Sequence, residues 1–389
     1  MPTDTQPTIA HLINTLAGGG TEHMLLRLLQ TFNRDQFRHV VITMREGGSL
    51  CAQLPDHVAV HAMGIEGRAR TAGVRIATIL RRSGATVLHA GNTVVWRDAI
   101  LAGWLSRGTQ VVLGFHGFDG AARPMESIAP VARWAVRCGC RVTSVSQAGA
   151  AELADGAGIP ASAIQLLPNG VDTDRYFPRG AEVCRDVRAT LGFAPDDYVV
   201  GMVGSLSPIK RHELLLEAAA CCAPTMPRLR LMIVGDGPRR AELEQIADRL
   251  GHSGRVLFTG TRDDIPELLA AMNLFVCCSS AEGASNALLE AMASGVPVIT
   301  TPVGDHAQLI SGHRAGIVLE EQTPRALAAA MESALLISPV ERRPTVIRSL
   351  QASAAEYEAY YAALIAAPHH IRKLQRRGLS LAERCDCSF

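Results

Sequence analysis

The chain has 389 residues, 48% of them hydrophobic, which is too long for one ordinary α/β core and suits two domains. Its formal net charge of +1 at pH 7 creates no global field that would attract a polyanion, so we expect no nucleic-acid partner. The first residues contain no basic segment followed by an apolar core, and no later stretch is long and apolar enough to span a membrane. We therefore expect a cytoplasmic protein.

The first half of the chain alternates short strands with helical segments. A β-rich run at residues 8–16 leads into a glycine loop at 17–20, and residues 21–32 then carry apolar side chains at helical spacing. Further short Val-rich runs occupy residues 39–44, 86–90, 110–117 and 140–146. This order is typical of a parallel sheet whose strands are connected by helices.

The second half repeats the pattern, with strand-like runs at residues 198–206, 228–237, 255–260, 274–279 and 296–301. Two doubly wound α/β domains are therefore predicted. The prolines and glycines of residues 167–180 interrupt any regular element, so we place a hinge between residues 170 and 197. The predicted domains are residues 1–180 and 181–345.

Two glutamates, Glu282 and Glu290, stand close together in the sequence, and neither has a neighbouring basic residue to pair with. Ser285 is a favourable helix N-cap, so a helix is predicted over residues 286–294, with Glu282 on the loop before it. Open α/β sheets bind ligands at the carboxyl ends of their strands, where a helix start can also bind an anion. The pair therefore predicts a slot for a nucleotide sugar, and the alternative is two solvated charges.

The stretch EGASNALLEAMASGVPVITTPVGD, residues 282–305, resembles the E-x7-E signature of the retaining glycosyltransferases of family 4. This resemblance implies the GT-B fold, in which two Rossmann-like, doubly wound domains face each other. It also implies a C-terminal helix, residues 346–366, that crosses back to the N-terminal domain, and a tail at 367–389. Five more blocks resemble the family in its own order: LAGGGTE (16–22), GFHG (114–117), LPNGVDTDRYFP (167–178), VGSLSPIKRHELLLEA (203–218) and LMIVGDGPRRAELE (231–244).

The resemblance also implies roles for particular residues. Glu290 would hold the ribose hydroxyls of the nucleotide, and Glu282 would lie beside the donor sugar. Lys210 would bind the diphosphate, whose growing negative charge a lysine, a helix start and glycine amides are placed to stabilise. His116 would approach the donor sugar and the reacting carbon. The other donor-binding residues that it implies are Gly19, Gly20, Ser205, Arg211, Ser285, Asn286 and Ala287.

Two positions depart from the family. Ser205 stands where many members have an arginine, and Arg211 is the candidate to replace that phosphate donor. Asp305 stands where the family often has a second glycine, which changes the expected shape of the donor-sugar pocket. No metal site is expected, because Asp172 and Asp174 mimic a metal-binding pair but belong to the interdomain segment. The cysteines likewise never form the two spaced pairs of a zinc site.

The sequence thus predicts a retaining glycosyltransferase that uses neither a metal nor a cofactor. It would move a sugar from a nucleoside diphosphate to a hydroxyl of a glycan or lipid-linked acceptor, in cell-surface polysaccharide or glycolipid synthesis. Two alternatives stay open, a nucleotide-sugar epimerase of the same fold and a non-enzymatic sugar-binding protein. The phosphate-directed Lys210 and the lack of an export signal argue against the second.

A basic surface is also predicted on the first half of the chain. Its arginines surround one helical segment and flank Trp134 in another: Arg68, Arg70, Arg75, Arg81, Arg82, Arg133 and Arg137. Basic amphipathic segments can lie at an anionic membrane surface. Two interpretations stay open, a peripheral contact with the inner face of a membrane and a solvated basic face without a partner.

Overall fold

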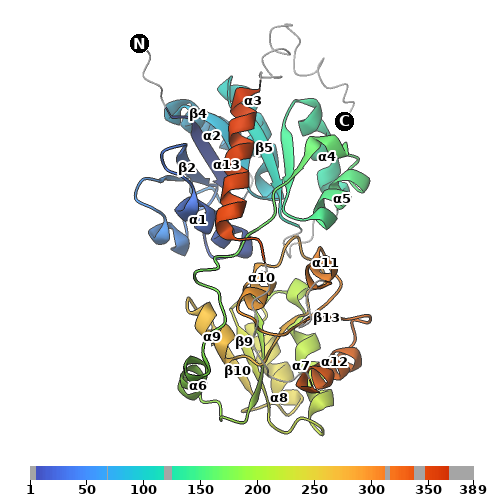
Figure 1. The fold of residues 1–389 in the computed structure, drawn as a ribbon. Helices are drawn as coiled ribbons and strands as arrows, with labels where there is room; N and C mark the ends of the chain where they lie inside the picture. The colour runs from blue at the N-terminus through green and yellow to red at the C-terminus, as the bar shows by residue number, and fades with distance from the viewer. Residues whose placement is uncertain (1–5, 68, 118–124, 312–315, 337–346, 368–389) are drawn as a thin grey trace. The chain divides into compact units, whose positions relative to one another are not determined.

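The structure is a computed structural model, and it describes residues 6–67, 69–117, 125–311, 316–336 and 347–367 (Figure 1). The chain divides into two compact units. Unit 1 comprises Met1–Asn169 and Leu350–Phe389, and unit 2 comprises Gly170–Ser349. The predicted domain boundary at 180/181 falls inside unit 2, because Val171 forms a bridge with Ser349 and Tyr176 is buried in the core of that unit.

Unit 1 contains a parallel sheet of seven strands in the order β3-β2-β1-β4-β5-β6-β7. The strands are β1 (Thr8–Ile13), β2 (Arg38–Thr43), β3 (Ala59–Ala62), β4 (Ala85–Ala90), β5 (Gln110–Phe115), β6 (Arg141–Ser144) and β7 (Ile164–Leu166). Five of them coincide with the runs predicted from the sequence. The other two, β3 and β7, are short edge strands without a buried Val-rich run, so their sequences gave no signal.

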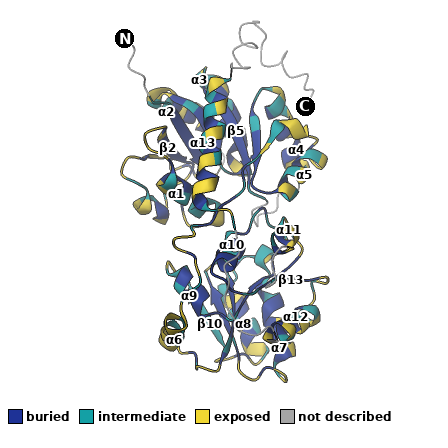
Figure 2. Ribbon diagram, viewed as in Figure 1, coloured by how far each residue is buried: buried dark blue, intermediate teal, exposed yellow. Residues whose placement is uncertain are grey.

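Helices cover both faces of this sheet, because successive strand residues point to opposite faces. One face packs against α2 (Ala72–Ser83), α3 (Trp96–Ser106), α4 (Met125–Arg137) and α5 (Gln147–Asp155). The other face packs against α1 (Gly20–Thr31) and α13 (Leu350–Ala366), as Figures 1 and 2 show. The C-terminal helix therefore belongs to unit 1, and nearly all of the predicted tail, 368–389, lies outside the described residues.

Unit 2 contains a parallel sheet of six strands in the order β10-β9-β8-β11-β12-β13. The strands are β8 (Tyr198–Val203), β9 (Leu229–Val234), β10 (Val256–Gly260), β11 (Leu274–Cys277), β12 (Val298–Thr300) and β13 (Gly316–Val318). The helices are α6 (Ala181–Thr190), α7 (His212–Cys222), α8 (Arg240–Arg249), α9 (Ile265–Ala271), α10 (Asn286–Ala293), α11 (His306–Ile310) and α12 (Pro324–Leu336). Helix α6 lies inside the segment that the sequence suggested as a hinge.

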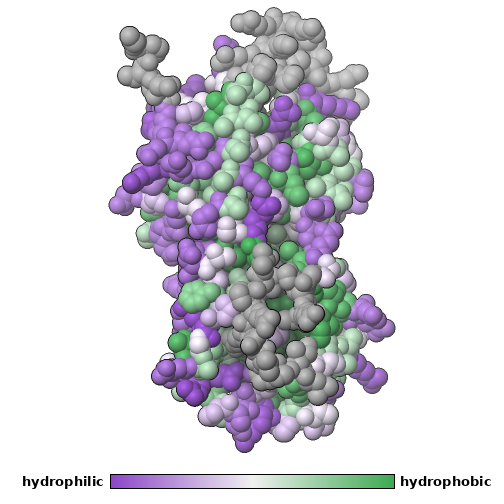
Figure 3. Space-filling model, viewed as in Figure 1, coloured by the Kyte–Doolittle hydropathy of each residue, from purple (hydrophilic) through white to green (hydrophobic). Residues whose placement is uncertain are grey.

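A row of histidines lies under α13 on the sheet of unit 1. His39 on β2, His11 on β1 and His89 on β4 are all buried, and His11 Nε2 lies 3.0 Å from His39 Nδ1. Helix α13 covers them with Tyr357 and Tyr361. Its outer side is mostly alanine and forms a pale green stripe on unit 1 in Figure 3. The row is thus a set of polar rings enclosed in an apolar layer.

Burial keeps these imidazoles neutral. Burial lowers the pKa of His39 to about 4 and that of His89 to about 3, from the ordinary value of 6.5. The ring of His39 also stacks on Phe32, with the ring centroids 4.7 Å apart. A proton added to this row would place a charge where no water can solvate it.

We expect the free energy of unfolding to decrease as the pH falls from 7 to 5. Unfolded histidine has a pKa of about 6.5, and folded His39 has one of about 4. Between these two pKa values the unfolded chain binds more protons than the folded chain. The stabilising contribution of neutral His39 is therefore fully present above the unfolded pKa and is lost as the pH falls toward the folded pKa.

The variant His39→Phe should show a smaller dependence of stability on pH, because it removes one of these protonation sites and keeps an aromatic ring. His61→Gln, which changes an exposed histidine, should retain the wild-type dependence. Urea unfolding at several pH values measures the slope. An unchanged slope in His39→Phe would contradict the assignment of the pH dependence to this row.

Candidate functional site

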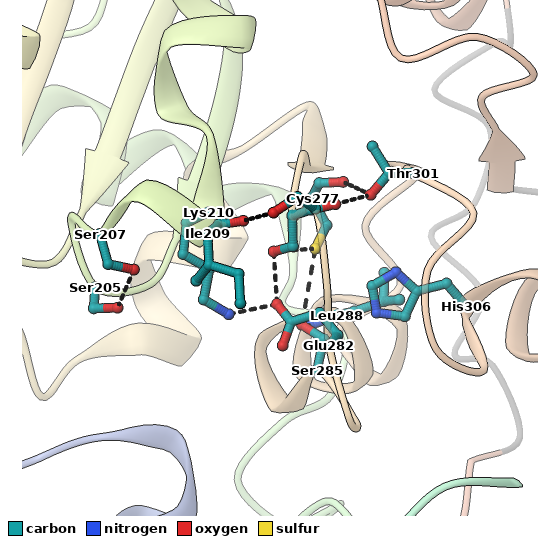
Figure 4. A network of polar contacts seen from close by, with 12 residues as sticks. Ser205, Ser207, Ile209, Lys210, Cys277, Glu282, Ser285, Leu288, Thr301 and His306 are labelled. Carbon is teal, nitrogen blue, oxygen red and sulfur yellow. Dashed lines mark hydrogen bonds and ion pairs between the residues drawn. The ribbon is translucent and has the colours of Figure 1, made fainter. Parts of the chain in front are cut away.

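The strand order of the second sheet reverses between β8 and β11. Neighbouring strands at such a reversal send their following helices to opposite faces, which leaves a crevice at their carboxyl ends. The loops at this crevice are residues 204–211, after β8, and residues 278–285, after β11 (Figure 4). Five of the residues predicted for the donor lie on these two loops: Ser205, Lys210, Arg211, Glu282 and Ser285.

Lys210 and Glu282 form an ion pair that joins the two loops. The Lys210 ammonium donates to Glu282 Oε1, and the Ser279 hydroxyl donates to the same oxygen at 2.6 Å. Only 23% of the lysine side chain and 11% of the glutamate side chain are exposed. Burial would lower the pKa of Lys210, but the carboxylate of Glu282 outweighs it and raises that pKa. Glu282 has no basic neighbour in the sequence, and its partner Lys210 comes from 72 positions away.

Backbone contacts fix the loop that carries Glu282. Ser280 N donates to Ile209 O at 2.8 Å, and the Thr301 hydroxyl, directly after β12, donates to Ser279 O at 2.6 Å. Gly304 has φ +53°, and a Cβ there would lie 2.7 Å from Glu282 O. A side chain at position 304 would therefore collide with the backbone at Glu282, which explains the glycine.

Helix α10 begins where the sequence predicted. Ser285 is its N-cap and accepts a hydrogen bond from Leu288 N at 3.4 Å. Asn286 and Ala287 form its first turn and are half-buried. Glu290 lies further along the helix with 5% of its surface exposed, so the alternative that it is a solvated helix charge is wrong.

The two departures from the family have different surroundings. Ser205 is exposed, and its hydroxyl lies 3.2 Å from that of Ser207. The Arg211 guanidinium donates to the side-chain and backbone oxygens of Gln322, at 2.5 and 3.3 Å. Arg211 and Lys210 therefore have different partners, Gln322 and Glu282. Asp305 is half-buried and precedes α11.

Unit 1 holds the other predicted residues at an equivalent place. Its strand order reverses between β1 and β4, and the loop after β1 ends at Gly19, the N-cap of α1, so Gly20 is the first helical residue. Half-buried His116 follows β5, and burial lowers its pKa to about 4. A cavity of about 30 Å³ is lined by His116, by His89 and by Thr21 of the first turn of α1. Neutral His116 can therefore accept a hydrogen bond there.

The described residues contain no group of three or more His, Cys, Asp or Glu side chains that could hold a metal ion. The Asp172 side chain stabilises a local turn: its Oδ1 accepts hydrogen bonds from the backbone amides of Asp174 and Arg175 at 3.1 and 3.3 Å. No helix among the residues that the structure describes is long and apolar enough to cross a membrane.

Sequence reasoning missed several residues that support the site. Ser279 and Thr301 hold the Glu282 loop, and Tyr361 contacts His89 behind His116. Ser279 and Thr301 are the last residues of two predicted strands, so their position at the carboxyl edge of the sheet was a usable signal. Tyr361 carried no such signal, because its partner His89 is distant in the chain.

The two parallel sheets, each with helices on both faces and loops at a reversal of strand order, define the GT-B class of fold. The structure is similar to that of HepE from Anabaena, solved with UDP and glucose, at a TM-score of 0.75 and 23% identity. That similarity covers 92% of this chain and 99% of the HepE chain.

Sequence comparisons identify the family. The model of Glycosyltransferase Family 4 matches residues 18–175, and that of Glycosyl transferases group 1 matches residues 197–336. The chain belongs to the family 4-type glycosyltransferases.

Two curated relatives illustrate the similarity. The 2-deoxystreptamine glucosyltransferase of Streptomyces kanamyceticus is 30% identical over 258 residues, 64% of each chain. The lipopolysaccharide core biosynthesis mannosyltransferase LpsB of Rhizobium meliloti (strain 1021) is 30% identical over 172 residues, 42% of this chain and 48% of its own length. In both cases the chain spans less than two thirds of the relative's length.

Proposed function

We propose that the protein is a retaining glycosyltransferase that moves one sugar from a nucleoside diphosphate to an acceptor hydroxyl, without a metal or other cofactor. The observation that carries the proposal is the Lys210–Glu282 pair, held at the reversal of strand order in front of the N-terminus of α10. The pair offers a cation to a diphosphate and a carboxylate to sugar hydroxyls, and the start of α10 offers the positive end of its helix dipole to the same diphosphate. Relatives named as glucosyl- and mannosyltransferases, and a neighbour solved with UDP and glucose, support this class of donor.

The chemistry assigns different work to each residue. The acceptor oxygen forms a bond to the sugar C1, the bond from C1 to the phosphate oxygen breaks, and the acceptor's proton passes to the released diphosphate. Lys210 stabilises the negative charge that grows on that leaving group. Glu282 lies beside the sugar, where positive charge develops, and Glu290 holds the ribose hydroxyls. Arg211 and Ser205 border the phosphates. We also assign donor contacts to His116 and to the amides of Gly19 and Gly20.

The acceptor is a hydroxyl of a glycan or lipid-linked glycan in cell-surface polysaccharide or glycolipid synthesis. One relative is named for lipopolysaccharide core biosynthesis, which supports this setting. The alternative of a nucleotide-sugar epimerase makes a different product from the same donors.

A panel of labelled nucleotide sugars tests the proposal. We expect one donor to release its nucleoside diphosphate slowly in water and faster with a glycan acceptor, with the sugar's anomeric configuration kept in the product. Chromatography with NMR of the product measures both. An epimerised nucleotide sugar would instead identify an epimerase, and binding without any turnover would identify a sugar-binding protein.

Variants of the two glutamates should separate binding from chemistry. Glu290→Ala should mainly raise KM, because ribose contacts are the same in the ground and transition states. Glu282→Gln should mainly lower kcat, because its charge acts most as the reaction proceeds. Steady-state kinetics with saturating acceptor and calorimetry with nucleoside diphosphate measure the difference. The control is Glu217→Gln, which replaces an exposed carboxylate on α7 with a carboxamide.

The ion pair allows a further separation. Lys210→Ala should lower kcat by about 100-fold or more, and it should also reduce stability because it leaves Glu282 unpaired. Adding Glu282→Gln should restore the melting temperature and leave kcat low. Normal kcat in Glu282→Gln, with nucleotide affinity intact in Glu290→Ala, would refute the proposed donor site.

We propose also that unit 1 contacts an anionic membrane surface. The side chains of Arg70, Arg75, Arg81 and Arg82, on and next to α2, are exposed, whereas Arg68 lies outside the described residues. Helix α2 packs against α3, and an apolar hollow of about 50 Å³ beside α3 is lined by Trp104 and Trp134. Trp104 is 41% exposed. Exposed tryptophan beside arginine is typical of a surface at the lipid interface.

Removing two of these charges should weaken binding to anionic vesicles. Each arginine near such a surface contributes about 1 kcal/mol, so Arg70→Gln/Arg82→Gln should bind roughly tenfold or more weakly. The control Arg185→Gln/Arg249→Gln removes two exposed charges from unit 2 and should bind like the wild type. Sedimentation with phosphatidylglycerol vesicles at two salt concentrations measures this. Equal, salt-insensitive sedimentation of all three proteins would indicate a solvated basic face.

A further inference from the structure

A buried hydrogen bond connects the C-terminal helix with the sheet behind His116. The Tyr361 hydroxyl on α13 lies 2.7 Å from His89 Nδ1 on β4. Tyr361 is fully buried and His89 is 6% exposed, so water does not compete for this contact. The residues are 272 positions apart in the chain, so the contact exists only because α13 packs on unit 1.

The contact selects one tautomer of His89. Burial raises the pKa of Tyr361 well above its ordinary value, so the phenol keeps its proton. Among the described residues, His89 Nδ1 is the hydrogen-bond partner found for that phenol, so the phenol donates and Nδ1 accepts. The imidazole is neutral because burial lowers its pKa, so its one proton is on Nε2.

The protonated Nε2 of His89 faces the same backbone position as His116. A Cβ on Gly114 would lie 3.0 Å from His89 Nε2 and 3.3 Å from His116 Nε2, so both rings converge over that glycine. The two histidines also line the same cavity. Two more polar groups surround His89: Thr143 Oγ1 on β6 lies 3.5 Å from His89 Nε2, and the His11 ring centroid lies 6.4 Å from that of His89.

We propose that His89 is a positioning residue for His116, and that Tyr361 holds it in the tautomer with the proton on Nε2. The N–H dipole of His89 then points its positive end toward the edge of His116. That field fixes the orientation of the His116 ring and keeps it neutral, because a proton added to His116 would face the positive end of the His89 N–H dipole. This inference rests on the proposed role of His116 in sugar transfer.

The chain offers a matched pair of variants for the test. Tyr361→Phe removes only the hydroxyl that bonds His89. Tyr357→Phe makes the same change one helical turn earlier on α13, where the buried phenol has no hydrogen bond within the described part of the chain. Both keep the aromatic ring over the histidine row. Gly114→Ala is a second route to the same effect, because its methyl group pushes the two rings apart.

Histidine-selective ¹⁵N NMR of the full chain is the first measurement, and it needs no activity. In the wild type and in Tyr357→Phe, His89 should show one tautomer with its proton on Nε2. In Tyr361→Phe it should show a mixture of tautomers, and both the shift and the titration midpoint of His116 should move. An unchanged His116 signal in Tyr361→Phe and in Gly114→Ala would overturn the proposal.

Kinetics on the donor found in the panel is the second measurement. Tyr361→Phe should lower kcat by about tenfold, as expected for one lost hydrogen bond. Its KM should stay unchanged, and the acid limb of its pH profile should shift. Tyr357→Phe should match the wild type. Equal kinetics of both variants would overturn the positioning role. A wild type without transferase activity would instead refute the proposed function, and the NMR comparison would still decide whether His89 orients His116.

Discussion

The ion pair between Lys210 and Glu282 joins the two loops on which the candidate site of unit 2 is built. These loops follow β8 and β11, which are neighbours in the sheet although 72 positions separate the two residues. The parallel arrangement puts their carboxyl ends at one edge, and the reversal of strand order leaves that edge open. Each charge is partly buried and is stable there because the other is present.

The same geometry places the residues of unit 1, where the reversal lies between β1 and β4. There the polar groups are not ions but neutral imidazoles enclosed by α1 and α13. A neutral ring can accept a hydrogen bond and needs no counter-ion, so it can remain buried beside an apolar core. The two units therefore stabilise their buried polar side chains in different ways, unit 2 by an ion pair and unit 1 by neutral rings.

Local signals in the sequence predicted most of the fold. Helix α10 was placed correctly because Ser285 caps it, and the central strands were found because they are short Val-rich runs. Edge strand β3 was missed because its residues are exposed and carry no buried pattern. The partner of Glu282 was missed because only the sheet brings Lys210 next to it. The histidine row was missed for a similar reason, since a histidine within a Val-rich run does not interrupt the strand pattern.

The position of α13 has a consequence for synthesis of the chain. Unit 2 is a continuous segment, Gly170–Ser349, and can fold as soon as it leaves the ribosome. Unit 1 is made of two segments, and the face of its sheet that carries the histidine row is covered by α13 together with α1. Until Leu350–Ala366 has been translated, the part of that face under α13 stays open to water. Unit 1 is thus completed last, although its first segment is translated before unit 2.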